Sequence, residues 1–446
     1  MNQEHLLKEQ ARLAHHVKTI LALSKAKGAS QAEVAVSAES GMSVTVRMRE
    51  LETVEHNENA GFGITVYFDK RKGSASTTDT SPAAIEAAVS AACNIAQYSS
   101  EDPCAGLPEP ELLAPDFVDL DLYHPWDITP EQATERALAC EAIALQKNPL
   151  VTNSEGVILT TYQGLRVYGN SHGFLGHFAS SRHSLSCSLI AEQAGSMQRD
   201  YSYTVARDQH DLRKAELVAD AAVERTIRRL NARKLGTRQV PVVFAADLAT
   251  GLIGSYLKAV SGSNLYRESS FLLNSLGQQV FPEFMEIRED PFVRKGLASC
   301  PYDSEGVKVQ ARDLVKQGCV EGYLLSCYSA RKLGMQTTGN AGGAHNIYVK
   351  NHNQSLAQLL KTMDTGLLIT DVMGQGVNLV TGDYSRGASG FWVEQGEIQF
   401  PVEEITIAGT LQNMYRGIIA IGDDVETRGY IHCGSILIDN LTVAGN

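Results

Sequence analysis

The stretch TGDYSRGASGFWVE, residues 381–394, contributes more to the fold prediction than any other part of this sequence. It places an Asp and an Arg three residues apart among small residues, and it then runs into an aromatic segment. Small residues let a backbone approach a partner closely, and consecutive exposed N–H groups can form an anion-binding concavity. The residues alone favour a simpler interpretation, in which a tight corner of a β-barrel leads into a strand. In that interpretation, Asp383 and Arg386 pair with each other.

The bulk composition is typical of a large soluble protein. The chain has 446 residues, of which 43% are apolar and 20% are charged, so we expect two or three domains. A net charge of -12 argues against a nucleic-acid partner. The sequence has neither an apolar run of the ~18 residues that a membrane helix needs nor a secretory signal pattern. Eight cysteines without C-x-x-C spacing favour a reducing compartment, and we therefore expect a cytoplasmic protein that does not contact membranes.

The first unit, residues 1–98, is predicted to be an α+β layer. Residues 4–27 have helical periodicity, and residues 34–68 alternate between apolar and polar side chains as half-buried antiparallel strands do. Ser81 followed by Pro82 is typical of a helix start, and the helix should reach Tyr98. The turns between the strands are predicted at residues 39–41 and 69–73.

The remaining chain divides into three further parts. Residues 99–128 are rich in proline and are predicted to be an extended connector. Residues 129–232 should complete the N-terminal half, with a capping box at Thr129, a helix from Asp208 to Leu230 and short antiparallel strands that end at glycines 156, 164, 169 and 173. Residues 233–446 are predicted to form a β-rich, barrel-like domain with flanking helices at 248–260 and 356–363. The acidic clusters at 283–290 and 423–426 are interpreted as solvated turns.

Three local patterns could carry chemistry. His172, His177 and His183 fall within twelve residues on predicted strands. The spacing of His172 and His177 is odd, so their side chains point to opposite faces unless a glycine bends the chain, and this spacing does not favour a zinc site. Residues 169–173 match G-x-S-x-G, yet no helix follows, so a glycine-rich hairpin turn is the predicted structure. A third segment, residues 337–346, combines three glycines with His345 and Asn346 and could bind a substrate backbone.

Several motifs make the chain resemble the TldD/PmbA family, on its PmbA (TldE) side. The stretch 381–394 is similar to the C-terminal signature of that family. Further matches extend over nearly the whole chain, at residues 62–67, 71–76, 271–277, 295–299, 328–334, 396–409 and 439–445. The resemblance implies a cytoplasmic zinc metallopeptidase system that trims or degrades unfolded peptides, including microcin precursors and an antitoxin.

The zinc motif of the family's TldD-type members has no counterpart here. Those members carry His-Glu-x-x-x-His on a helix together with a distal Cys ligand. The matching position falls near Ile253, Gly254 and Lys258, and neither His nor Glu occurs between Pro241 and Arg267. Ile and Lys do not replace imidazole ligands, and Gly cannot act as a general base. We therefore expect no catalytic residue and no bound metal in this chain.

The resemblance implies that this chain acts as the PmbA-type subunit beside a TldD-type subunit that carries the zinc. Candidate peptide-binding or interface residues are Asp383, Tyr384, Ser385, Arg386, His345 and Asn346. The isolated chain could also form a homodimer. Two other functions stay open, namely an autonomous peptidase with a non-standard site at His172, His177 and His183, and a non-catalytic peptide-binding or regulatory protein.

Overall fold

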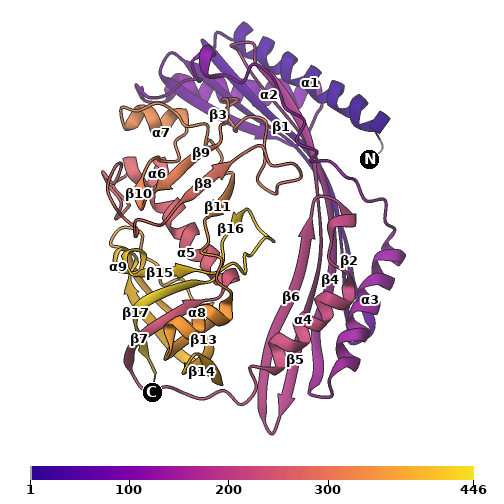
Figure 1. The fold of residues 1–446 in the computed structure, drawn as a ribbon. Coiled ribbons are helices and arrows are strands. Elements are labelled where there is room, and N and C mark those ends of the chain that lie inside the picture. The colour runs from indigo at the N-terminus through magenta and orange to yellow at the C-terminus, as the bar shows by residue number, and fades with distance from the viewer. Residues whose placement is uncertain (1–2, 446) are drawn as a thin grey trace.

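The computed structural model describes residues 3–445 and shows two halves that lie side by side (Figure 1). Residues 1, 2 and 446, which end the predicted units 1–98 and 233–446, lie outside the described residues. The N-terminal half is built on one six-stranded antiparallel sheet in the order β3-β2-β1-β4-β5-β6. Its strands are β1 (Gln31–Arg47), β2 (Glu50–Phe68), β3 (Arg71–Thr77), β4 (Val151–Asn170), β5 (Leu175–Gln193) and β6 (Ser196–Ala206).

The strands of this sheet are longer than the sequence predicts. The turn predicted at residues 39–41 is wrong, because β1 runs through Gly41 and ends at a turn formed by Met48 and Arg49. A Cβ atom on Gly41 would lie 3.1 Å from the Thr161 carbonyl oxygen, so this glycine permits close strand pairing. The turn predicted around residues 69–73 is confirmed between β2 and β3.

The prediction that glycines end the strands is also wrong for most of β4. Gly156, Gly164 and Gly169 do not break the strand, and only Gly173 lies in the turn before β5. Gly156 marks a bulge with a φ of 122°, which a glycine adopts without strain. Glycine inside these strands therefore allows bulges and close packing instead of ending the strand.

Four helices cover one face of the sheet, namely α1 (Gln3–Ala26), α2 (Pro82–Tyr98), α3 (Pro130–Lys147) and α4 (Ala215–Ile227). Val34 and Val36 of β1 pack under α1 and α2, and Val44 and Val46 pack under α3 and α4. Because these four valines have even numbers, they share one face of the strand. The predicted caps at Ser81 and Thr129 are confirmed, whereas α4 is shorter than the predicted helix because a separate 3-10 turn, Gln209–Asp211, precedes it.

The C-terminal half contains a closed five-stranded barrel, which confirms the predicted α+β class with a barrel-like domain. Its strands are β7 (Arg238–Phe244), β12 (Gly366–Met373), β13 (Asp383–Glu394), β14 (Glu397–Thr410) and β17 (Ile436–Ala444). The barrel closes where β14 pairs with β17, from Thr406 opposite Ala444 to Ala408 opposite Thr442. β15 (Ile418–Ile421) extends the same sheet from β17.

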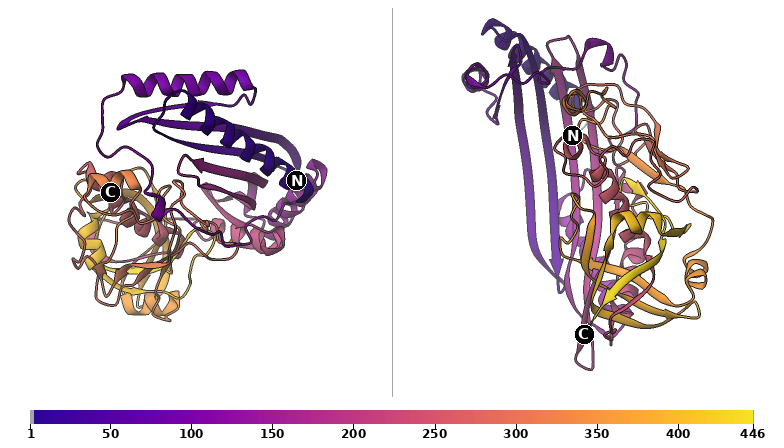
Figure 2. Two further views of the ribbon diagram at one scale, coloured as in Figure 1. Left: turned by 90° about the horizontal axis from the view of Figure 1, so that it is seen from above. Right: turned by 90° about the vertical axis from the view of Figure 1, so that its left-hand side faces the viewer.

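The C-terminal half also contains a second sheet of short strands. It contains β8 (Ile287–Asp290), β9 (Arg312–Lys316), β10 (Cys319–Val320), β11 (Asn346–Val349) and β16 (Ile431–His432). The helices of this half are α5 (Ala246–Ala259), α6 (Gly262–Tyr266), α7 (Cys327–Lys332), α8 (Leu356–Met363) and α9 (Leu411–Arg416). Figure 2 shows this half alongside the long strands. Across residues 3–445, no helix has the length and apolar character needed to cross a membrane.

The stretch 381–394 is mostly strand and not loop. The predicted barrel corner is confined to Thr381 and Gly382, and β13 begins at Asp383. The predicted pairing of Asp383 with Arg386 is wrong, because residues three apart on a strand point to opposite faces. Asp383 instead accepts a hydrogen bond of 2.6 Å from the Thr381 hydroxyl, and Arg386 donates to the Val372 carbonyl.

The connector after α2 is irregular apart from one 3-10 turn, Pro110–Leu112, and it is fastened to the C-terminal half. The guanidinium of Arg331 in α7 donates to the carbonyl oxygens of Gly106 and Leu107 at 2.9 and 2.6 Å. It also pairs with the Glu109 carboxylate at 2.8 Å. The connector therefore joins the two halves at the end of the sheet where α1 and α2 lie.

Candidate functional site

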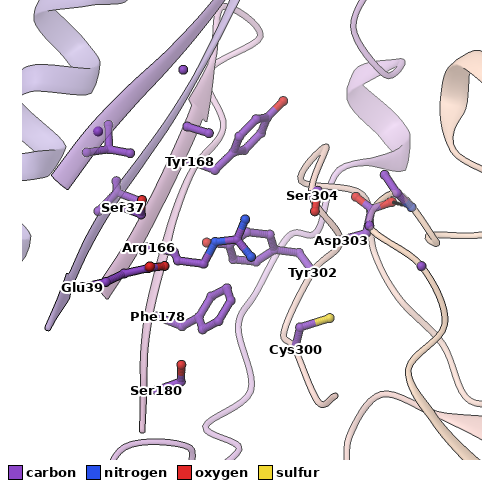
Figure 3. Close-up of a pocket in the computed structure, with 18 of the residues that line it drawn as sticks. Ser37, Glu39, Arg166, Tyr168, Phe178, Ser180, Cys300, Tyr302, Asp303 and Ser304 are labelled. Carbon is purple, nitrogen blue, oxygen red and sulfur yellow. Dashed lines mark hydrogen bonds between the residues drawn. The ribbon is translucent and has the colours of Figure 1, made fainter. Parts of the chain in front are cut away.

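A cleft of about 950 Å³ separates the uncovered face of the sheet from the C-terminal half. Figure 3 shows one wall formed by strands of the sheet and the other formed by a loop of the C-terminal half. The sheet contributes Ser37, Glu39, Arg166, Tyr168, Phe178 and Ser180. The opposite wall consists of residues 297–300 and 302–304 and the glycine-rich segment 341–345. The odd-numbered residues of β1 face this cleft because its even-numbered residues are buried under the helices.

Tyr302 sets the distance between the two walls. Its ring centroid lies 5.1 Å from that of Phe174 and 5.8 Å from that of Phe178. A Cβ atom on Gly176 would lie 2.5 Å from the Tyr302 ring, so glycine is required where the ring meets β5. The Tyr302 hydroxyl and the Arg207 Nε are buried and have no hydrogen-bond partner among the described residues. Both residues line the cleft, but these two atoms are themselves buried and do not face a ligand in it.

Buried carboxylates lie next to Tyr302 in the same loop of the C-terminal half. Asp303 accepts hydrogen bonds of 2.9 Å from the amides of Glu305 and Val307 and one of 3.0 Å from Ala341. Burial raises the pKa of Asp303 to about 7, and the nearby charge of Glu305 contributes to the rise. Burial likewise raises the pKa of Glu305, whose carboxylate accepts from the Cys327 amide. One cleft wall therefore carries Asp303, an acid that titrates near neutrality.

His345 is held by a buried ionic network. Its Nδ1 lies 2.9 Å from Oε1 of Glu289, and Oε2 of Glu289 is 3.0 Å from the Nε of Arg312. Burial by itself lowers the pKa of His345, but hydrogen bonds with Cys300 and Glu289 outweigh it and raise the pKa to about 9. Asn346 donates to the Asp290 carbonyl at 2.8 Å and to the Ser299 hydroxyl at 2.7 Å. His345 thus lines the cleft, and Asn346 is buried directly behind it.

The remaining candidate residues lie elsewhere. Asp383, Tyr384, Ser385 and Arg386 all lie on β13 in the barrel, and none of them lines the cleft. Tyr384 is buried against Phe244, and Ser385 is exposed. The structure therefore does not bring the two groups of candidate residues together.

The helix that matches the family's zinc position is α5. Ile253 is fully buried in the barrel core, and Gly254 and Lys258 line a smaller cavity of about 390 Å³. Residues 341–344 line this cavity and the large cleft alike, so the two hollows adjoin across that segment. An alkyl side chain, a glycine and an ammonium group do not provide the N, S or O ligands that zinc requires. Among residues 3–445, no group of three His, Cys, Asp or Glu side chains is arranged to hold a metal ion.

The three histidines near the start of β5 do not converge. His172 binds the Pro108 carbonyl, His177 contacts Gln10 of α1, and His183 binds the His124 carbonyl. Six residues along a strand separate His177 from His183 by roughly 20 Å. The G-x-S-x-G segment is a hairpin turn between β4 and β5, as predicted, and its Ser171 accepts from the Ala32 amide.

The sequence analysis missed Glu289, Cys300 and Asp303. The acidic cluster at 283–290 was interpreted as a solvated turn, but Glu289 is only 1% exposed. Ile287 and Glu289 lie two residues apart and share the buried face of β8, and this alternation was the available signal. No comparable pattern marks Cys300 or Asp303, because both lie in an irregular loop.

The fold and the cleft define a two-part α+β protein with a long sheet opposite a small closed barrel. Family models for domain 1, the central domain and the C-terminal domain of the PmbA/TldA metallopeptidases match residues 32–96, 123–230 and 237–445. The chain is 51% identical to "Metalloprotease PmbA" of Escherichia coli O157:H7, over 97% of this chain and 96% of that protein. It is 50% identical to a "Metalloprotease PmbA homolog" of Haemophilus influenzae, over 100% and 99%.

Solved structures share the same fold. A crystal structure from Bacteroides thetaiotaomicron has a TM-score of 0.90 at 23% identity and covers 97% of this chain and 98% of its own. TldE from Thermococcus kodakarensis has a TM-score of 0.85 at 21% identity and covers 96% and 100%. The chain belongs to the PmbA/TldD metallopeptidase family as a PmbA member, which confirms the resemblance seen in the sequence.

Proposed function

We propose that this chain is the PmbA-type subunit of a cytoplasmic zinc metallopeptidase complex, and that it binds unfolded peptides in the cleft while a TldD-type partner supplies the zinc. One observation carries the proposal. The α5 position lacks zinc ligands, yet it adjoins a large open cleft across the glycine-rich segment 341–344. A subunit of this kind positions substrate and does not cut it. The three residues at the α5 position, Ile253, Gly254 and Lys258, would then take no part in hydrolysis.

The cleft suits an extended peptide. Its size falls at the upper end of the range of ~300–1,000 Å³ that is typical of ligand pockets. Arg166 and Glu39 offer charges of both signs, while Tyr302 and Phe178 offer aromatic surface. Such a mixed lining accepts varied side chains, as a protein acting on unfolded precursor peptides or antitoxins would need.

The partner is proposed from the relatives. Haemophilus influenzae has a "Metalloprotease TldD homolog" that is 26% identical to this chain, over 58% of the chain and 61% of that protein. The same organism also has the PmbA homologue described above. The two kinds of chain therefore occur together, and the all-free cysteines of this chain fit a reducing cytoplasm.

The test combines this chain with a TldD-type chain from the same cell. We expect a complex of defined stoichiometry that contains zinc and degrades an unfolded fluorescent peptide, whereas this chain alone binds the peptide without cutting it. Zinc-dependent cleavage by the purified single chain would overturn the proposal. If no TldD-type chain associates with it, peptide binding without catalysis becomes the better assignment.

A cleft variant separates peptide binding from assembly. Arg166→Ala should weaken peptide binding about tenfold or more without preventing association with the partner. Arg199→Ala is a matched control, because Arg199 lies on β6 of the same sheet, is 69% exposed and pairs only with Glu155 on the surface. Equal peptide affinities of the two variants would contradict the assignment of the cleft as the peptide site.

A further inference from the structure

The smaller cavity beside α5 contains one basic side chain and no acidic one. Its volume of about 390 Å³ lies within the range of ~300–1,000 Å³ that is typical of ligand pockets. Among the described residues that line it, Lys258 is joined by no Asp, Glu, His or Arg. The polar part of the lining consists mostly of hydroxyl groups, from three tyrosines and from Ser261, Ser263, Ser326 and Ser329. The charge that this cavity presents to a ligand is therefore positive.

Lys258 has no counter-ion. It lies in the last turn of α5 and is exposed, and its ammonium forms neither an ion pair nor a hydrogen bond with any of residues 3–445. Lys332 of α7 differs in this respect. Its ammonium lies 5.3 Å from the ring centroid of Tyr328, a residue of the same cavity, but it pairs with the Asp102 carboxylate at 3.0 Å. Lys258 thus keeps its full charge for a ligand.

The glycine-rich segment adds backbone donors to the cavity. The amides of Gly342 and Ala344 have no acceptor among the described residues, whereas the amide of Gly343 donates to the Asn340 carbonyl at 3.0 Å. Gly342 and Gly343 have φ values of 104° and 115°, a conformation that glycine adopts without strain. Free amides in such a segment are typical donors to an anionic ligand.

The serines of the lining come from two turns that pack closely together. Ser261 donates to the Lys258 carbonyl at 2.8 Å, and its hydroxyl oxygen lies 3.4 Å from that of Ser263. A Cβ atom on Gly262 would lie 2.2 Å from the Ser329 hydroxyl oxygen, so glycine is required where α6 meets α7. Hydroxyl groups from both turns therefore line the cavity together with Lys258.

The position of the cavity indicates which anion it would bind. It adjoins the cleft across residues 341–344, and Leu257, Leu324 and Tyr266 give it an apolar wall. A peptide that lies in the cleft can cross this segment closely, because glycine has no side chain in the way. The C-terminus of a peptide brings a carboxylate to the unpaired ammonium, whereas the N-terminus would bring a second positive charge and be repelled.

We propose that the cavity beside α5 binds the C-terminal carboxylate of a peptide whose preceding residues lie in the cleft. Lys258 supplies the opposite charge, and the free amides of the glycine-rich segment and the Ser263 hydroxyl donate hydrogen bonds. The last side chain of the peptide packs against Leu257, Leu324 and Tyr266. This inference rests on the proposed function, and it adds the direction in which the peptide is bound, with its C-terminus at α5.

The experiment compares two forms of one unfolded peptide, with a free or an amidated C-terminus. Each form carries a fluorophore at its N-terminus, and its binding to the full-length chain is measured by fluorescence anisotropy. We expect amidation to weaken binding about tenfold or more, because it removes a charge-assisted hydrogen bond. Lys258→Ala should weaken binding of the free form to the same degree. It should leave the affinity of the amidated form unchanged, which also shows that the variant is folded.

Lys361→Ala is the matched control, because Lys361 is also exposed in the last turn of a helix, α8, and lines neither the cavity nor the cleft. This variant should bind both peptides as the unmodified protein does. A preference for the free carboxylate that survives Lys258→Ala would overturn the proposal. Displacement of the peptide by micromolar inorganic phosphate would assign the cavity to phosphate and would overturn it as well.

The same measurements distinguish this inference from the proposed function. Equal affinities of the unmodified protein for the two forms would overturn the carboxylate site. If Arg166→Ala then weakens both forms equally, the peptide function of the cleft stands without that site. If neither form binds to the unmodified protein, the proposed peptide function fails and this inference fails with it.

Discussion

Oε1 of Glu289 lies 2.9 Å from Nδ1 of His345, and the two side chains are 1% and 7% exposed. This pair joins β8 to the end of the glycine-rich segment that separates the cleft from the α5 cavity. Arg312 of β9 completes the network through the second carboxylate oxygen. Buried charges of this kind are costly to leave unpaired. The cleft wall is therefore tied to the protonation states of a few named groups.

The first prediction concerns stability between pH 6.5 and 9. The pKa of His345 is raised from its ordinary 6.5 to about 9, so the folded state holds the proton more tightly than the unfolded state does. The resulting stabilisation is fully present below pH 6.5 and is lost as the pH rises toward 9. The loss should be on the order of 2–3 kcal/mol in the free energy of unfolding. Urea unfolding at intervals from pH 6 to 9.5 measures it.

His345→Gln provides the comparison for this pH profile. The variant should be less stable at pH 6 because the buried Glu289 carboxylate loses its cationic neighbour, and its stability should change little between pH 6.5 and 9. A variant with the same slope as the unmodified protein would show that another group titrates in this range.

The second prediction concerns Asp303 and a lower pH range. Its pKa is raised from 3.8 to about 7 by burial, so the folded state disfavours the ionised form. The associated stability is present below about pH 4, falls as the pH rises through 7, and is fully lost above that. Asp303→Asn should flatten this part of the profile. It should also cost about 1 kcal/mol at pH 4, because the new amide cannot accept from the Ala341 N–H.

Asp313→Asn is the control for Asp303, since Asp313 is an exposed carboxylate on β9. Its variant should keep the slope between pH 4 and 7. If Asp303→Asn and Asp313→Asn have the same profile, Asp303 does not titrate near neutrality in the folded protein.

Sequence patterns predicted those parts of the fold that depend on local physics. The caps at Ser81 and Thr129 and the helix at residues 356–363 depend on interactions within a few residues, and each was placed correctly. The turn at residues 39–41 was wrong, because the role of Gly41 depends on a strand more than a hundred residues away in the sequence. Closure of the barrel between β14 and β17 likewise depends on tertiary pairing.

The candidate site was predicted less completely than the fold. His345 and Asn346 were found because they follow three glycines in a short segment. Cys300 and Glu289 were not found, since neither lies near His345 in the sequence, and the hydrogen bonds from Asn346 to the adjacent residues Ser299 and Asp290 exist only in the folded chain. A site assembled from one short strand and two irregular segments leaves little periodic signal in the sequence.

The third prediction tests the contact that fastens the connector to α7. Arg331 donates to three backbone carbonyls, of Cys104, Gly106 and Leu107, and pairs with Glu109. Arg331→Lys keeps the charge but cannot reproduce this planar set of donors, and should cost about 2–3 kcal/mol of unfolding free energy. Limited proteolysis should then cut residues 99–113 faster.

Arg294→Lys is the matched control for Arg331. Arg294 is 71% exposed and pairs only with Asp121, so the variant should differ from the unmodified protein by less than about 0.5 kcal/mol. Comparable proteolysis of the two variants would show that Arg331 does not hold the connector in place.

The last prediction returns to the stretch 381–394, where two glycines of β13 should differ sharply. A Cβ atom on Gly390 would lie 1.9 Å from the Leu368 carbonyl oxygen and 2.9 Å from the Ile369 Cα atom, which belong to the backbone of β12. Backbone atoms of a paired strand cannot move aside without breaking the ladder. On Gly387, the nearest atom to a Cβ would be the Met373 Cβ at 3.6 Å, an ordinary contact.

Gly390→Ala should therefore cost more than about 3 kcal/mol of unfolding free energy, and Gly387→Ala should stay within about 1 kcal/mol. Urea unfolding followed by tryptophan fluorescence measures both, since Trp392 lies on the same strand. Similar stabilities of the two variants would contradict the close approach of β12 to Gly390, where an added Cβ would lie 1.9 Å from the Leu368 carbonyl oxygen. The expected contrast would show that the stretch identifies the family because its small residues let the strands of the barrel pair closely.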